Sequence, residues 1–489
     1  MTDHSIIADS ENFSLDLPQR TVPQNSSWEE EYAHSLGIQA YIYGFPWIYN
    51  AQLRWLWASP GGKKLSEEMN MPDMYAPINS FHHANKLANP ASQTGGCPNC
   101  DTLYSTAWLD VSHEPIVLSV PAVVDRFYCI EMVSMDADNF AYVGARSTGV
   151  EAGHFLIAGP GWNGQVPEGV LDVLPRSRTA GILFMGRTGV NDTTQEDLDL
   201  AKTIQKQYLL TPLSDWPNTP PPQPTHVMVP YGVDYNQTLG AWKTMNEAMT
   251  ENPPGLPPGI NQDQLLKLFA TIGIGPGQDL ATQSDATRAG LQRAATDGLS
   301  MIKKMSEGRG KTVNGWTYPP TNIGRAGQSS DFITRAALQS LAGICANDPA
   351  EAVYLNVFTD NENLTLDGKN RYTLSFKKGG FPQFDASKHG FWSITMYNST
   401  YNLVPGSNSY SINSYYPKFQ GLDSSGGMTI LIQSEEPTEL PAGTYWLQSP
   451  SGTDDDMFFL FLRVYVPDPS ISVTQTYAPP QIVRNDIAQ

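Results

Sequence analysis

The chain has 489 residues, and at roughly 100 to 200 residues per domain this length predicts two to four domains with more than one buried core. Hydrophobic residues make up 40% and aromatic residues 10%, which is typical of an ordered globular protein and excludes a disordered chain. The formal net charge of -19 argues against a surface that neutralises a phosphate backbone or anionic lipid, so we expect neither nucleic acid nor membrane as a partner.

The first twenty residues predict a cytoplasmic protein. They contain several acidic side chains and no apolar run, so neither a secretory signal nor a mitochondrial presequence is expected. No later run approaches the roughly 18 apolar residues of a membrane span. Asn-x-Ser/Thr sequons such as those at Asn191 and Asn398 would fit a secreted glycoprotein, but the missing signal makes this location the less favoured one.

The N-terminal part of the chain predicts a flexible arm followed by a helix. Residues 1–24 are polar and aperiodic. Ser27 and Glu30 then form a capping-box pair, and aromatic residues recur at helical spacing. We expect a helix from about 27 to 44 that resumes after Pro46 and continues through Trp57.

The next segment has the two-residue period of strands. Short runs bounded by Pro, Gly and Asp predict strands at 103–109, 116–120, 127–133, 141–146, 154–158 and 182–186. Because no helical pattern separates these runs, they favour an antiparallel sandwich over a parallel sheet.

Helical signals return in the middle of the chain, and a second β block closes it. Thr193 with Glu196 predicts one helix start, and apolar residues at helical spacing predict helices at 291–305 and 331–345. Residues 217–224 predict a proline-rich link. The last strands are expected at 372–376, 391–397, 428–433, 444–447 and 457–466.

This order predicts a multidomain α and β protein with two antiparallel β-sandwich, jelly-roll-like domains and helical subdomains. It fits neither a dinucleotide-binding fold nor a barrel of alternating strands and helices. The expected parts are a flexible arm, an N-terminal helical segment, a first β-sandwich, a helical subdomain with the proline-rich link and a second β-sandwich, at 1–24, 25–100, 101–190, 191–350 and 351–489.

The sequence carries no motif of a common cofactor or metal site. Walker loops, dinucleotide fingerprints, nucleophile elbows and His-Glu-x-x-His are missing, so no cofactor is predicted, although a lone metal ion is left open. Cys97 and Cys100 have redox spacing, but they run into a predicted strand rather than a helix start. We interpret them as thiols or an incidental disulfide and expect them to be dispensable for activity.

Two adjacent histidines, His82 and His83, are candidate catalytic residues. Adjacent side chains on a strand point to opposite faces, so one of the two could address a substrate. A neutral imidazole beside a carboxylate such as Asp101 would serve as a general base near neutral pH. The alternative is a hydrogen-bonded structural histidine.

The densest polar cluster runs from Asn99 to Asp110. A carboxylate (Asp101), a phenol (Tyr104) and an amide (Asn99) at the start of a strand suit proton transfer or oxyanion binding, whereas the alternative is that they tie down the preceding loop. Strand alternation places Asp101 and Tyr104 on opposite faces, so a shared site requires a bulge or a turn at the strand end.

The residues of this cluster and of the C-terminal block resemble a known pair of families. The first motifs are similar to the domain-of-unknown-function 1254 family, and the later ones to its usual partner, family 1214. Together the resemblance covers about residues 30–485. The motifs that carry it are Asn99-x-Asp101-Thr102-Leu103-Tyr104-Ser105, Trp108-Leu109-Asp110, Arg126-Phe127-Tyr128, Asn139 to Gly144, Gly159-Pro160-Gly161-Trp162, Gly390 to Tyr397 and Leu460 to Tyr465.

The resemblance implies architecture more than activity: paired β-sandwiches with helical subdomains. The chain departs from the family pattern at residues 445–450, where an Asn-Trp-Leu-Pro-x-Pro segment is usual, and this puts substrate choice in doubt.

Charged and aromatic residues of the resembling segments complete the candidate site. Arg126, Arg146 and Arg187 could clamp a substrate carboxylate or form structural pairs with Asp101, Asp110 or Asp138. The expected catalytic residues are Asp101, Tyr104, His82, His83 and Arg146. The expected substrate-binding residues are Asn99, Arg126, Asn139, Tyr142, Trp392, Tyr397 and Tyr410.

For function, we predict a cofactor-independent enzyme that acts on a small organic molecule by acid/base chemistry, as a hydrolase, a lyase or a cyclising isomerase. Its site is expected where the Asn99–Tyr104 strand meets the tyrosine-rich C-terminal sheet. The alternative is a non-catalytic small-molecule-binding or assembly protein, and a homo-oligomer is left open. Convergence of the candidate residues on one cavity would favour the enzyme.

Overall fold

The computed structural model describes residues 26–69, 71–91, 96–192, 194–218, 238–255, 262–306, 310–414, 421–451 and 456–485. The predicted flexible arm and most of the predicted proline-rich link lie outside these residues. No helix of the described chain combines the length and apolar character needed to cross a membrane.

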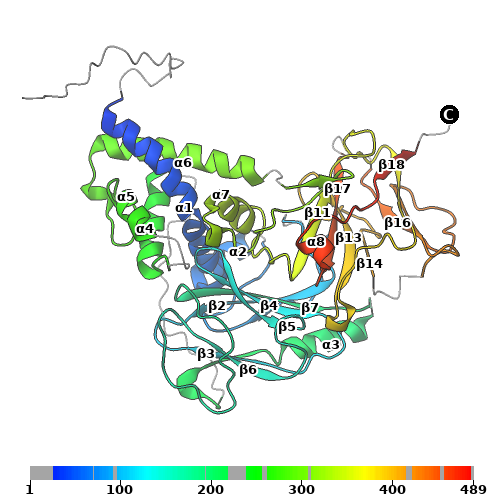
Figure 1. The fold of residues 1–489 in the computed structure, drawn as a ribbon, viewed down its shortest axis with the longest axis horizontal. Coiled ribbons are helices and arrows are strands. Elements are labelled where there is room, and N and C mark those ends of the chain that lie inside the picture. Colours follow the sequence, from blue (N-terminus) through cyan, green and yellow to red (C-terminus); the bar gives the residue numbers. More distant parts are fainter. Residues whose placement is uncertain are drawn as a thin grey trace, which may run out of the picture.

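Helices α1, α4, α5 and α6 gather in one region, at the upper left of Figure 1, whereas α3 lies apart from them in the lower part of the view. The long helix α1 packs against α6, with α4 and the segment η4 also in contact with it. The helical elements are α1 (Trp28–Ala58), α2 (Pro60–Glu68), α3 (Gln195–Gln205), α4 (Thr238–Glu251), α5 (Gln262–Ala270), α6 (Asp285–Ser306), α7 (Phe332–Thr334), η4 (Arg335–Leu341) and α8 (Pro469–Ser472).

Helix α1 begins as predicted but does not break at Pro46. The Ser27 side chain accepts a hydrogen bond from the Glu30 amide at 3.2 Å. Pro46 lies inside the helix and is buried, and its sequence neighbours Phe45 and Trp47 are buried as well. A proline removes one helical hydrogen bond, and burial of the surrounding apolar side chains offsets that loss.

The first β region holds two antiparallel sheets, in the order β1-β2-β7-β4-β5 and β6-β3-β8. Its strands are β1 (His82–His83), β2 (Thr102–Asp110), β3 (Ile116–Val120), β4 (Tyr128–Ser134), β5 (Asn139–Gly144), β6 (Gly153–Ile157), β7 (Gly181–Gly189) and β8 (Leu209–Pro212). Alternation along β7 buries Ile182 and Phe184 in one core with residues of β3 and β6, and Leu183 and Met185 in another with the helices. The larger sheet is therefore covered on both faces.

The second β region also holds two sheets, in the order β14-β13-β17-β11-β10-β9 and β16-β15-β12-β18. These strands lie at the right of Figure 1. They are β9 (Thr312–Val313), β10 (Trp316–Thr317), β11 (Ala352–Val357), β12 (Arg371–Phe376), β13 (Phe391–Asn398), β14 (Ser411–Asn413), β15 (Met428–Gln433), β16 (Thr444–Gln448), β17 (Phe458–Tyr465) and β18 (Ile482–Asn485).

Most predicted elements are present, and three details differ. Strands β15 and β16 pair in parallel, so the prediction of purely antiparallel pairing is wrong at this edge. The cap of α3 is Thr194, which accepts from the Asp197 amide, one residue beyond the predicted pair. The predicted helix at 331–345 is a short α-turn followed by the π-helix η4, which ends at Leu341. The chain is thus a multidomain α and β protein with several antiparallel sheets.

Candidate functional site

A cavity of about 530 Å³ lies between the two β regions and the end of η4. This volume falls in the range of pockets that hold small organic molecules. Its lining comes from β2 and β7 on one side, from β11 and β17 on the other, and from the segment that follows η4. The polar side chains of the lining include Asn99, Tyr104, Arg187, Tyr354, Arg463 and Tyr465.

Alternation along β17 builds one wall of this cavity. Phe459, Phe461, Arg463 and Tyr465 line it, whereas the intervening residues 458, 460, 462 and 464 are buried in the core of the second β region. Successive side chains of a strand point to opposite faces, so a single strand serves both the core and the cavity.

The π-helix η4 supplies the apolar wall. Leu338 and Leu341 face the cavity, and Ile344 follows from the next loop. The opposite side of η4 is anchored: the Arg335 guanidinium donates to the Tyr43 carbonyl of α1 at 2.6 Å, and Gln339 donates to Asp138 at 3.0 Å. These buried contacts fix the position of η4, and π-helices often occur at functional sites.

Asn99 holds two phenols at the cavity. Its backbone amide donates to the Tyr104 hydroxyl oxygen at 3.3 Å, and its side-chain amide donates to the Tyr465 hydroxyl oxygen. Within the described chain neither hydroxyl donates a hydrogen bond in return. A phenol is both donor and acceptor, so both hydroxyl hydrogens remain available to a ligand.

Arg187 is buried and fully engaged. It is 6% exposed and donates to Glu131 at 2.7 Å, to the Asn347 side chain at 3.2 Å and to the Cys345 carbonyl at 3.0 Å. Asn347 in turn donates to the Tyr354 hydroxyl at 2.5 Å. This network joins β7 of the first β region to β11 of the second across the cavity wall.

The carboxyl group of Glu131, which pairs with Arg187, has a raised pKa. Burial raises the pKa of Glu131 to about 7, although the neighbouring Arg187 opposes this rise. Burial also raises the pKa of Asp348 and of Glu351, which lie in the same network. Clustered buried carboxyl groups of this kind are a feature of functional sites as well as of structural ion-pair networks.

Arg463 is the second buried guanidinium of the cavity, and it is not fully engaged. It is 4% exposed and donates through Nη2 to the Cys97 carbonyl at 2.8 Å. Its Nη1 atom is buried and has no hydrogen-bond partner among the described residues.

Some of the sequence-predicted residues line the cavity and the others lie outside it. Asn99 and Tyr104 line the cavity. Asp101 does not: it is fully buried beside them, accepts from Asn413 of β14 at 2.9 Å and joins the two β regions. Burial raises the pKa of its carboxyl group, although hydrogen bonds from Asn413 and Ser393 oppose this rise.

The two histidines lie on β1, outside the cavity lining. His83 shares a hydrogen bond of 2.9 Å with Ser105 and stacks on Phe81 with ring centroids 5.4 Å apart. Burial lowers the pKa of His83 to about 4, and it also lowers the pKa of His82. The predicted partnership with Asp101 is not seen, because β1 pairs with β2 at Ser105 and Thr106 while Asp101 faces Asn413.

The arginines of the first β region make structural pairs. Arg126 is buried against Asp125 and Asp197, at 2.9 Å from each. Arg146 pairs with Glu351 and lies over the Tyr142 ring. Neither arginine lines the cavity in the described chain, and the partners proposed from the sequence for these two, Asp101, Asp110 and Asp138, are not the ones they pair with.

Asn139 and Tyr142 belong to the network behind the cavity. Asn139 donates to the Tyr142 hydroxyl and to the Ala346 carbonyl, both at 2.8 Å. The Tyr142 hydroxyl donates to Glu131 at 3.3 Å. These contacts orient the carboxyl group that holds Arg187.

The C-terminal aromatic candidates are core residues. Trp392 stacks on Phe376 and Phe381 in the second core. Tyr397 is buried, donates to the Pro98 carbonyl at 2.8 Å and lies beneath the Arg463 guanidinium at 5.4 Å. Tyr410 packs nearby but lies outside the lining.

Sequence reasoning missed Arg463, Tyr465 and Tyr354 as site residues. One signal could have found the first: Arg463 is the only charge in the strand Phe-Phe-Leu-Phe-Leu-Arg-Val-Tyr, and a charge inside an apolar strand requires a partner.

Cys97 and Cys100 are free thiols in the structure. Burial raises the pKa of each to about 12, so neither is a nucleophilic thiolate at neutral pH. Replacing both with Ser is expected to leave turnover within about tenfold of the wild-type rate in any assay that detects activity. A larger loss, above about 1.4 kcal/mol of transition-state stabilisation, would contradict this expectation.

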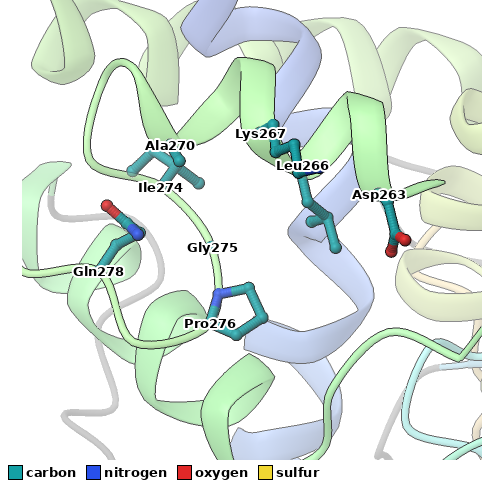
Figure 2. Close-up of a pocket in the computed structure, with 8 residues that line it drawn as sticks. All are labelled: Asp263, Leu266, Lys267, Ala270, Ile274, Gly275, Pro276 and Gln278. Atoms are coloured by element: carbon teal, nitrogen blue, oxygen red, sulfur yellow. The ribbon is translucent and has the colours of Figure 1, made fainter.

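A second hollow of about 280 Å³ lies beside α5 and the loop after it. Figure 2 shows Asp263, Leu266 and Lys267 of α5 opposite Pro276 and Gln278. Both charged side chains are exposed, so this hollow offers weaker interactions than the buried cavity. Within the described ranges no three His, Cys, Asp or Glu side chains are grouped to hold a metal ion.

The strands on the two sides of the cavity lie in segments that match two different family models. The model for a protein of unknown function, DUF1254, matches residues 78–212, and the model for DUF1214 matches residues 351–469. The chain therefore contains regions that match both family models, with DUF1254 on the N-terminal side and DUF1214 on the C-terminal side. This confirms the resemblance found in the sequence.

Comparison with solved structures supports the same architecture. The VPA0106 protein from Vibrio parahaemolyticus aligns with 22% identity and a TM-score of 0.67, over 93% of this chain and 100% of that one. This likeness shows a shared fold. An uncharacterized protein from Burkholderia cenocepacia aligns with 10% identity and a TM-score of 0.40 over 94% of each chain. No curated protein matches the chain.

Proposed function

We propose that the protein is an enzyme without a redox cofactor that performs acid/base chemistry on a small organic molecule in the cavity between its two β regions. The observation that carries this proposal is the convergence of three phenols (Tyr104, Tyr354 and Tyr465) and two guanidinium groups (Arg187 and Arg463), from both family segments, on one cavity of about 530 Å³. The lack of a nucleic-acid partner remains a proposal that rests on the acidic composition, and cytoplasmic location also remains a proposal.

The lining suits reactions in which negative charge develops on a substrate oxygen. Burial raises the pKa of Tyr354 to about 12 and that of Tyr465 well above its ordinary value, so both stay protonated at neutral pH and keep a hydroxyl hydrogen to donate. Arg187 lies 6.0 Å from the centre of the Tyr104 ring. Donors and cations aimed at an oxyanion or enolate stabilise it, as hydrolases, lyases and cyclising isomerases require.

One observation favours the alternative, a non-catalytic binding protein. The described lining contains tyrosine, cysteine and arginine but neither a carboxylate nor an imidazole. Such a cavity has no strong proton acceptor at neutral pH, so a reaction needs the substrate or a water molecule to take that role.

We infer further that each β region is a sandwich. The first core combines Ile130 and Phe184 of the larger sheet with Leu118 and Phe155 of the smaller one. The second core likewise joins residues of β11, β13 and β17 to residues of β12, β15 and β18. Shared cores between two sheets support face-to-face packing.

A cavity-filling variant tests the proposed function. Leu341→Trp places a large ring in the cavity, and Leu440→Trp makes the same change at a position that is 42% exposed. The wild-type protein and each variant are incubated with a small-molecule extract of the source organism, and mass spectrometry follows what is consumed and formed.

We expect the wild type and Leu440→Trp to convert a compound that Leu341→Trp leaves unchanged. Retention of a compound without conversion would favour the binding protein. Equal conversion by Leu341→Trp and the wild type would place the site elsewhere.

A further inference from the structure

The buried Arg463 guanidinium lacks the counter-charge that such a group requires. No carboxylate of the described chain lies within ion-pair distance of it, whereas Arg187, Arg126 and Arg146 each have at least one. Moving an unpaired charge out of water costs several kcal/mol, so buried charges are normally paired. The fully buried Asp101 interacts electrostatically with Arg463 but forms no ion pair with it, and the hydrogen bonds of Asn413 and Ser393 have the larger effects on the Asp101 pKa.

The surroundings of Arg463 hold its guanidinium at the cavity. Its central carbon lies 5.2 Å from the centre of the Phe461 ring, 5.4 Å from Tyr397 and 6.0 Å from Tyr354. Rings attract a cation without neutralising it. With Nη2 bound to the Cys97 carbonyl, Nη1 keeps its capacity to donate.

Two further donors belong to the same cavity. Tyr104 and Tyr465 accept hydrogen bonds from Asn99 and retain their own hydroxyl hydrogens. Both phenols are among the groups that interact electrostatically with Arg463. Three donors with one positive charge match the two oxygens of a carboxylate.

The rest of the lining determines the chemical character of the other end of the ligand. Leu338, Leu341, Ile344 and Phe459 make this part of the cavity apolar. A ligand that satisfies both parts has one anionic end and an apolar body.

We propose that the cavity recognises a small monocarboxylate with an apolar aromatic or aliphatic body, whose carboxylate accepts hydrogen bonds from Arg463 Nη1 and from a phenol of Tyr104 or Tyr465. This inference rests on the proposed function, because it assumes that the same cavity binds the substrate.

The test compares charged and neutral probes of one shape. Isothermal titration at pH 7.5 measures the binding of benzoate, phenylacetate and hexanoate, and of benzamide, phenylacetamide and hexanamide. We expect at least one carboxylate to bind about tenfold or more tightly than its amide, because hydrogen bonds to charged groups are the stronger ones.

Variants at Arg463 separate recognition from folding. Arg463→Met is expected to abolish the preference for carboxylate while keeping or raising the thermal midpoint of the free protein, since it removes an unpaired buried charge. Arg463→Lys keeps the charge and is expected to retain part of the preference. A merely structural arginine would instead lower the midpoint in both variants.

Each outcome decides between the inferences. Equal binding of acids and amides, or a preference that survives Arg463→Met, overturns the carboxylate inference and leaves the cavity as the site. If neither class binds to the wild type, the carboxylate inference fails. If, in addition, Leu341→Trp converts the extract as the wild type does, the proposed function fails as well.

Discussion

Replacing Arg187 with Met is expected to lower the free energy of unfolding by about 3 to 5 kcal/mol at pH 7.5, because it leaves Glu131 buried without its cation. The Glu131 carboxyl group is fully buried, and Arg187 is its ion-pair partner at 2.7 Å. The variant also loses the hydrogen bonds of Arg187 to Asn347 and Cys345. Chemical denaturation of both proteins measures the difference.

Matched variants isolate the unpaired charge. Arg371→Met removes a guanidinium whose ion pair with Glu435 is 58% and 79% exposed, and is expected to cost less than about 1 kcal/mol. Adding Glu131→Gln to Arg187→Met is expected to restore part of the stability, because the buried charge is gone. If the double variant is no more stable than Arg187→Met, the loss comes from packing instead.

The pH dependence of this effect has a definite sign. Burial raises the pKa of Glu131 from 4.5 to about 7, so between these values the folded protein binds more protons than the unfolded chain. The contribution of Glu131 to stability is therefore present below pH 4.5 and is lost as pH rises toward 7. Without Arg187 this pKa rises further, so the destabilisation by Arg187→Met should be smaller at pH 5.5 than at pH 7.5.

Replacing Tyr104 with Phe is expected to lower turnover of the substrate about 100-fold, since it removes one hydroxyl that can donate to an oxyanion in the cavity. The side chain otherwise keeps its shape and its place on β2. Steady-state rates with the compound identified from the extract measure this effect.

Tyr372→Phe is the matched control. Its hydroxyl also accepts a backbone amide hydrogen bond, from Asp367 at 3.0 Å, but it lies in the second core away from the cavity. We expect turnover by Tyr372→Phe to stay within a few-fold of the wild type. Equal losses of turnover in both variants would indicate a general effect on folding. Full activity of Tyr104→Phe would mean that the Tyr104 hydroxyl takes no part in the reaction and that the side chain serves only in packing.

Local patterns in the sequence were sufficient for most of the secondary structure. The apolar runs of β7 and β17 and the capping pair at Ser27 can be recognised within a few residues, and these elements are present. The family motif around Asn99 and Tyr104 likewise led to one wall of the cavity. Local sequence misjudged Pro46, because the burial that keeps α1 continuous comes from contacts with α4 and α6.

The other wall of the site was decided by tertiary structure. Arg463 and Tyr465 lie more than 350 residues from Asn99, and only the packing of β17 against the first β region brings them together. The second β region also supplies Asn413, the partner of Asp101, whereas His83 meets Ser105 through the pairing of β1 with β2. Sequence alone therefore determined most of the strands and helices and the strand that begins the site. Only the tertiary structure showed that Arg463 is a buried cation without a carboxylate partner. The free-energy cost of burying a charge depends on the groups around it in space, and the sequence does not give these neighbours.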